Sequence, residues 1–203
     1  MKLSLLLAPV AVLLALASAP VLAQDPAWQN SYQLAAAGKY YEAIAALDRV
    51  PANGPDAELK TLRRGWLYYL SGSYNESVRE YRLAIERNSR SVDARIGVTL
   101  PLLALKRWRE AALNARIALD LAPNNYTALL RLTLAQEGQQ EWNDMAKTAA
   151  IMVAGYPSEA IPYVYLARAN VALNQRSDAI AAYSAVLARN PDNAEAKAYL
   201  EKK

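Results

Sequence analysis

Apolar residues recur every three or four positions along most of the chain after residue 25, in stretches separated by short polar turns. This spacing places the apolar side chains on one face of an α-helix, because an α-helix completes a turn in about 3.6 residues. The turns fall at 37–39, 71–73 and 105–107, and two of them contain glycine. The pattern predicts an all-α protein built from helix hairpins.

The hairpin pattern repeats with a period of 34 residues, which is a signature of stacked repeat proteins. An aromatic residue returns at this interval, at Tyr40, Tyr74, Trp108 and Trp142. Two positions later comes an acidic residue, in the series Glu42, Glu76, Glu110, Asp144 and Asp178. Proline follows the same period at Pro55, Pro123, Pro157 and Pro191, with Ser89 in the remaining place. The period divides the chain into units 24–57, 58–91, 92–125, 126–159 and 160–193, followed by 194–203.

The recurring positions have physical explanations. The acidic residue falls in the first turn of each second helix, where the helix dipole favours negative charge and backbone N–H groups lack partners. Ser73 and Glu76 have the spacing of a capping box, and Asp25-Pro26 predicts a cap and first residue for the first helix. Pro101 lies inside a predicted first helix, so a kink or a late start is expected there.

The repeat unit resembles the tetratricopeptide repeat (TPR). The resemblance covers most of the chain and rests on Gly65, Tyr68, Gly72, Tyr74, Tyr81, Ala84, Ala111, Ala118, Leu119, Pro123, Asn125, Leu166, Ala167, Ala179, Tyr183 and Pro191. The first and fourth units depart most, at Asn30 and Met145. The resemblance implies a right-handed superhelical solenoid of about five hairpins, with 194–203 as a short C-terminal capping helix. The alternative is an unrelated helical bundle with accidental periodicity.

The resemblance also implies that the first helix of each unit lines a concave groove. The positions that match the family's inward-facing ones are Trp28, Tyr32, Leu62, Trp66, Tyr69, Ile96, Leu100, Leu103, Leu130, Leu134, Val164, Arg168 and Val171. Such a groove is mostly apolar and would bind a helix or an extended peptide of a protein partner. Gly65 and Tyr68, by contrast, are expected to pack between helices.

Four arginines, Arg63, Arg95, Arg131 and Arg168, are expected near the edges of the groove and could pair with acidic groups of a partner. Three alternatives stand beside this interpretation. The aromatic stripe could be core, because a register error of one residue exchanges core and groove positions. The arginines could be solvated or paired within the repeats. The segment 194–203 could fold back and fill the groove.

The N-terminal segment has the pattern of a secretory signal peptide. Lys2 precedes an almost wholly apolar run at 3–16, and small residues follow at 17–23. Cleavage is expected after Ala23, because a cut after Ala19 would leave Pro20 at the bond. A soluble mature chain starting at Gln24 follows, and an uncleaved membrane anchor is the alternative. Because the chain has no cysteine, it lacks the disulfides of most eukaryotic secreted proteins, and the bacterial periplasm is the predicted location.

Composition argues against catalysis. The chain has neither histidine nor cysteine, which removes the commonest general base, metal ligands and a thiol nucleophile, although a Ser-Lys pair stays possible. We expect no cofactor and no metal. The formal charge of +4 is spread along the chain, so no nucleic-acid partner is expected. The carboxylate clamp of some TPR domains is also absent, since the corresponding places hold Trp28, Tyr32 and Leu62.

The predicted function is therefore a non-catalytic scaffold or adaptor that binds proteins during assembly of an envelope complex. The first alternative is a helper in polysaccharide synthesis or export, because similar repeat arrays occur in such systems. The second is a structural scaffold that assembles from copies of itself.

Overall fold

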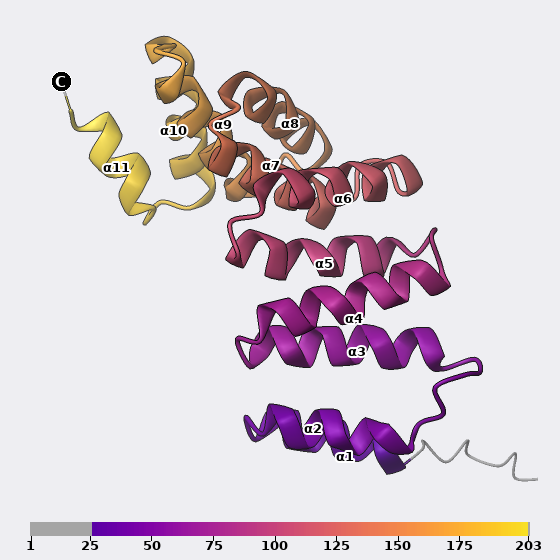
Figure 1. The fold of residues 1–203 in the computed structure, drawn as a ribbon. Helices are drawn as coiled ribbons and strands as arrows, with labels where there is room; N and C mark the ends of the chain where they lie inside the picture. The colour runs from indigo at the N-terminus through magenta and orange to yellow at the C-terminus, as the bar shows by residue number, and fades with distance from the viewer. Residues whose placement is uncertain (1–25, 203) are drawn as a thin grey trace, which may run out of the picture.

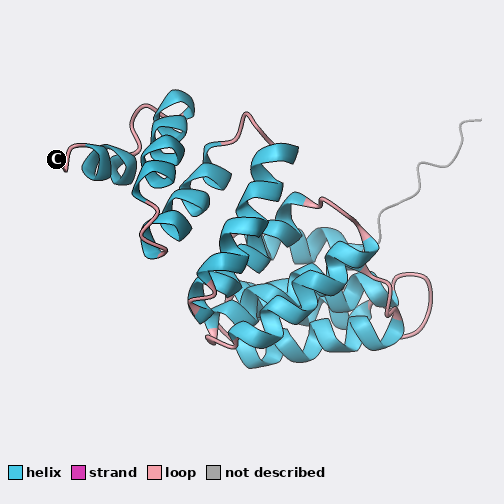
Figure 2. Cartoon of the chain, turned by 90° about the horizontal axis from the view of Figure 1, so that it is seen from above, coloured by secondary structure: helices cyan, strands magenta, loops and turns pink. Residues whose placement is uncertain are grey.

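The computed structural model describes residues 26–202, in which every regular element is helical (Figures 1 and 2). The predictions of a signal peptide and of a cap at Asp25 lie outside the described residues. The helices are α1 (Pro26–Ala36), α2 (Tyr40–Ala46), α3 (Ala57–Leu70), α4 (Tyr74–Arg87), α5 (Val92–Ala104), α6 (Trp108–Leu121), α7 (Tyr126–Gln139), α8 (Trp142–Gly155), α9 (Ala160–Ala172), α10 (Arg176–Arg189) and α11 (Ala194–Leu200), with a 3-10 turn at Leu47–Arg49. No helix between residues 26 and 202 combines the length and the apolar character that a membrane span needs.

Helix starts follow the 34-residue period. The four recurring aromatic residues are the first residues of α2, α4, α6 and α8. The five acidic residues of the series lie in the first turns of α2, α4, α6, α8 and α10, as the dipole argument predicts. The odd-numbered helices are therefore first helices, and each even-numbered helix completes its hairpin.

The capping box predicted at Ser73 is wrong. The Ser73 side chain accepts no backbone N–H of α4. Its Oγ lies instead 2.7 Å from the Tyr41 hydroxyl of α2 and accepts a hydrogen bond of 3.1 Å from Ser71 Oγ. The Ser73 hydroxyl therefore contacts Tyr41 of the preceding hairpin and does not cap α4.

The late start predicted for the helix that contains Pro101 is also wrong. Helix α5 begins at Val92, and the Ser91 side chain accepts the backbone N–H of Ala94, which fixes the start at the usual place. Pro101 is buried inside the helix, which continues to Ala104.

The hairpins stack into a curved solenoid, with α1 and α11 at opposite ends (Figure 1). Successive first helices contact one another, α3 with α5, α5 with α7 and α7 with α9, whereas successive second helices make fewer such contacts. Because the first helices lie closer together, the stack curves toward them. They line the concave side, and the second helices form the convex side.

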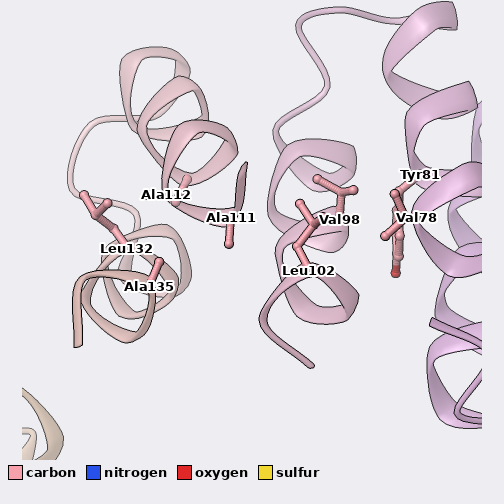
Figure 3. Close-up of a cluster of buried hydrophobic side chains, with 9 residues drawn as sticks. Val78, Tyr81, Val98, Leu102, Ala111, Ala112, Leu132 and Ala135 are labelled. Carbon is pink, nitrogen blue, oxygen red and sulfur yellow. The ribbon is translucent and has the colours of Figure 1, made fainter. Parts of the chain in front are cut away.

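The core consists of small and aliphatic side chains between successive helices (Figure 3). In the central cluster, Tyr81 of α4 packs near Val98 and Leu102 of α5. A methyl group built on Gly65 would lie 2.9 Å from the Tyr81 ring, and one on Gly97 would overlap the ring. Gly65 therefore marks a close helix contact, as expected.

Helix α11 continues the stack at its C-terminal end. Ala196 is fully buried, and the Tyr199 ring lies 4.7 Å from the Tyr183 ring of α10. The alternative in which 194–203 folds back into the groove is therefore wrong for the described residues to 202.

Candidate functional site

Three aromatic rings lie in a row in the N-terminal part of the solenoid, two on α3 and one at the start of α4. Trp66 and Tyr69 of α3 stack with their ring centroids 5.5 Å apart, and Tyr74 of α4 lies 5.7 Å beyond Tyr69. Trp66 remains 37% exposed, whereas Leu67, the next residue, is fully buried. One step along an α-helix turns the side chain by about 100°, so the two neighbours face different sides. Tyr69 and Tyr74 are half-buried, so the row is an aromatic surface that is exposed at Trp66 and partly covered beyond it.

The first hairpin contributes Tyr32, which is 55% exposed. The guanidinium carbon of Arg63 lies 4.0 Å from the centre of the Tyr32 ring, and Arg63 Nη2 donates a hydrogen bond of 3.3 Å to the Ser31 carbonyl. Arg63 thus holds α1 against α3. Trp28 is half-buried and packs against the N-terminal core cluster, so it serves the core at least in part.

The middle of the concave face is aliphatic. Ile96 and Leu100 of α5 and Leu130 and Leu134 of α7 are all partly exposed. Leu62 and Leu103, which are also partly exposed, pack against the central core cluster. At the C-terminal end, Val164 packs against the last core cluster, and Val171 is 39% exposed. Each of these predicted groove residues is therefore partly exposed, and some of them also pack against the core. We call the four aliphatic residues of α5 and α7, Ile96, Leu100, Leu130 and Leu134, the aliphatic floor.

Arg131 of α7 differs from the other arginines of this face. The Nε atoms of Arg63, Arg95 and Arg131 are all covered without a partner, but Arg63 and Arg95 donate from another nitrogen, whereas among the described residues no hydrogen bond or ion pair reaches Arg131 at all. Burial lowers the pKa of Arg131, and the nearby hydroxyls of Tyr69 and Tyr165 oppose that shift. No carboxylate of the described residues pairs with this guanidinium.

Arg168 of α9 is fully paired. It donates from Nη1 to Glu137 at 3.2 Å, and from Nε and Nη2 to the two oxygens of Glu195 at 2.9 and 2.7 Å. The hydrogen bonds to Glu195 raise the pKa of Arg168, and the same bonds lower the pKa of Glu195. The Tyr183 hydroxyl also donates to Glu195, at 2.7 Å. Arg168 is thus mainly a link between helices.

Arg95 does not lie at the groove edge as expected. Its Nη1 donates a hydrogen bond of 3.1 Å to Asn114 Oδ1 of α6, the second helix of its own hairpin. The side chain therefore points between the two helices.

Three residues around the arginines, Glu137, Tyr165 and Glu195, were not predicted from the sequence. The 34-residue period could have indicated two of them. Tyr165 lies 34 residues after Arg131, and Glu137 lies 34 residues after Leu103, and both earlier residues were expected at the groove or its edge. Within 26–202, no group of three or more acidic side chains is arranged to hold a metal ion.

Similarly folded solved structures cover nearly all of the described chain. YrrB, a TPR protein, superposes with a TM-score of 0.72 at 16% identity, covering 85% of this chain and 89% of YrrB. TTC0263, a TPR protein of Thermus thermophilus, gives 0.62 at 16% identity, with 86% and 95% covered. The chain has the tetratricopeptide-repeat fold.

A third similar structure is MamA from Desulfovibrio magneticus RS-1. It superposes on this TPR solenoid with a TM-score of 0.75 at 17% identity, covering 83% of this chain and 96% of that one. No protein-family model matches the sequence, and no curated protein matches it. The likeness is therefore one of fold, retained at low sequence identity.

Proposed function

We propose that the chain is a non-catalytic scaffold that binds a helix or an extended peptide of a protein partner in its concave groove. The observation that carries this proposal is the stack of the exposed Trp66 on the half-buried Tyr69, beside the aliphatic floor. Aromatic side chains at the centre of an apolar patch contribute most to protein binding, because they bury a large area with little loss of side-chain freedom. YrrB, which shares the fold, is described as having an unusual peptide-binding site.

We further propose that the mature chain is exported, cleaved after Ala23, and acts in the periplasm during assembly of an envelope complex. The support is the Lys2, apolar-run and Ala23 pattern together with the lack of cysteine. Mass spectrometry of protein from the native host should find an N-terminus at Gln24. An intact Met1 in the cytosolic fraction would contradict export.

The groove can be tested by crosslinking from defined positions. A photoreactive phenylalanine derivative at Trp66 should crosslink the partner in living cells. The matched position is Leu113 of α6, which is 56% exposed on the convex side and should give no such product. Equal crosslinking from both positions would contradict binding in the groove.

The second test separates binding from folding. The Trp66→Ala, Tyr69→Ala double variant should keep its melting temperature nearly unchanged, yet bind the crosslinked partner at least about tenfold more weakly, which is about 1.4 kcal/mol. The control is Leu67→Ala, which removes a fully buried side chain and should cost about 2–5 kcal/mol of folding free energy. If the double variant unfolds instead, these aromatics belong to the core.

A further inference from the structure

Most arginines near the ends of the groove already have partners. Arg168 binds two carboxylates, and Arg64 binds Glu80 at 2.9 Å and Asp48 at 3.0 Å. Arg63 has an aromatic ring and a carbonyl oxygen. Among the described residues, Arg131 has no hydrogen bond or ion pair of its own, although its Nε is covered by protein.

The partial burial of Arg131 without an anion is unfavourable. A guanidinium removed partly from water loses hydration, and this loss is normally compensated by an anion that accepts its N–H groups. The nearest acidic residue downstream on α7, Glu137, already accepts a hydrogen bond from Arg168. No carboxylate among the described residues pairs with Arg131, so its guanidinium can accept an anion from a partner.

The surroundings of Arg131 define what kind of anion fits. Burial lowers the pKa of Arg131, and electrostatic interaction with Tyr69 of α3 and Tyr165 of α9 only opposes that shift, so its charge lacks a compensating anion. Leu130 and Leu134 on the same helix are apolar and partly exposed. A planar carboxylate suits the guanidinium, which can donate two parallel hydrogen bonds to it.

We propose that Arg131 binds the side-chain carboxylate of an aspartate or glutamate within the partner peptide. This subsite rests on the proposed groove function and adds the chemistry of the partner. We choose a side chain within the peptide, and not its C-terminal carboxylate, because Arg131 belongs to α7. The groove continues past it toward α3 on one side and toward α9 on the other. The peptide's apolar residues then lie on Trp66 and on the aliphatic floor.

The test uses a synthetic library of short random peptides with acetylated N-termini and amidated C-termini, so that every carboxylate comes from a side chain. The purified full chain should enrich peptides with one acidic residue flanked by apolar residues. Arg131→Met should retain the apolar preference and lose the acidic one. The matched control, Arg109→Met on the exposed side of α6, should keep both.

The most enriched peptide then serves as a defined probe. Changing its acidic residue to the corresponding amide should weaken binding to the unmodified protein by about tenfold or more, because a charge-assisted hydrogen bond is lost. The same change should have no effect with Arg131→Met. Arg131→Lys should give an intermediate affinity, since lysine keeps the charge without the planar pair of donors.

The outcomes separate this subsite from the groove function. Apolar peptides enriched without an acidic preference, or an acidic preference that survives Arg131→Met, would overturn the subsite alone. A library from which no peptide is enriched would overturn peptide binding in the groove and the subsite with it. The melting temperature of Arg131→Met should stay within a few degrees of the unmodified value, because the substitution breaks no hydrogen bond or ion pair between described residues.

Discussion

Arg168 and Glu195 join α9 to α11 through two parallel hydrogen bonds, of 2.9 Å from Nε and 2.7 Å from Nη2. Helix α11 has only seven residues, and helices this short are unstable alone. Its position therefore depends on this pair, on the buried Ala196 and on the contact of Tyr199 with Tyr183. At the C-terminal end of the solenoid, α11 is therefore held by one ion pair and by a small apolar contact.

Loss of this link should loosen α11. Arg168→Leu leaves Glu137 and Glu195 without their cation and should lower the free energy of unfolding by about 1 kcal/mol, since the pair is partly exposed to solvent. Hydrogen exchange should accelerate at 194–200. The control is Lys147→Met, which breaks an exposed pair with Asp144 and should change stability by less than about 0.5 kcal/mol. Unchanged exchange in α11 would show that apolar packing alone holds it.

The same pair predicts a dependence on acid. The hydrogen bonds from Arg168 lower the pKa of Glu195 below its ordinary 4.5. A carboxylate with a lowered folded-state pKa stabilises the fold above its unfolded-state pKa and loses that contribution as pH falls through the folded-state value. The difference in melting temperature between the unmodified protein and Glu195→Gln should therefore be constant from about pH 7 to 5 and shrink below about pH 4.5. A difference that is independent of pH would contradict this account.

Periodicity was sufficient to predict the fold but not the contacts of individual polar side chains. The recurrence of Tyr40, Tyr74, Trp108 and Trp142 located the starts of four helices, because repeat position determines burial in a solenoid. The groove residues were expected from the resemblance to the TPR instead, and their role in binding stays a prediction. Which partner each arginine takes could not be predicted, since that depends on side chains from other helices: Arg95 turns to Asn114, whereas Arg168 meets Glu195.

The side-chain caps of the helices could not be predicted from the sequence alone either. Asn125 and Ser73 both precede a helix, but only the Asn125 side chain accepts a backbone N–H, that of Ala128 at 3.0 Å. Asn125→Ala should therefore cost about 1 kcal/mol in thermal or denaturant unfolding. Ser73→Ala should cost less, because it removes only hydroxyl contacts with Tyr41 and Ser71 near the surface. An equal loss in both variants would indicate that the contact with Tyr41 stabilises the fold as much as a cap does.

The last prediction concerns the close approach of helices around Tyr81. A methyl group on Gly97 would overlap Tyr81 Cε1, and the other edge of the ring lies close to Gly65, where a methyl group would be 2.9 Å from it. Alanine favours a helix over glycine by about 1 kcal/mol, but overpacking a buried ring costs about 1–3 kcal/mol, and at so short a distance the clash should prevail. Gly97→Ala should therefore lower the midpoint of denaturant unfolding. Gly155→Ala is the matched control, because a methyl group there meets nothing within 4 Å, and it should leave the midpoint unchanged or raise it. If Gly97→Ala also raises the midpoint, the Tyr81 ring can move aside, and the contact between α4 and α5 is looser than the packing shows.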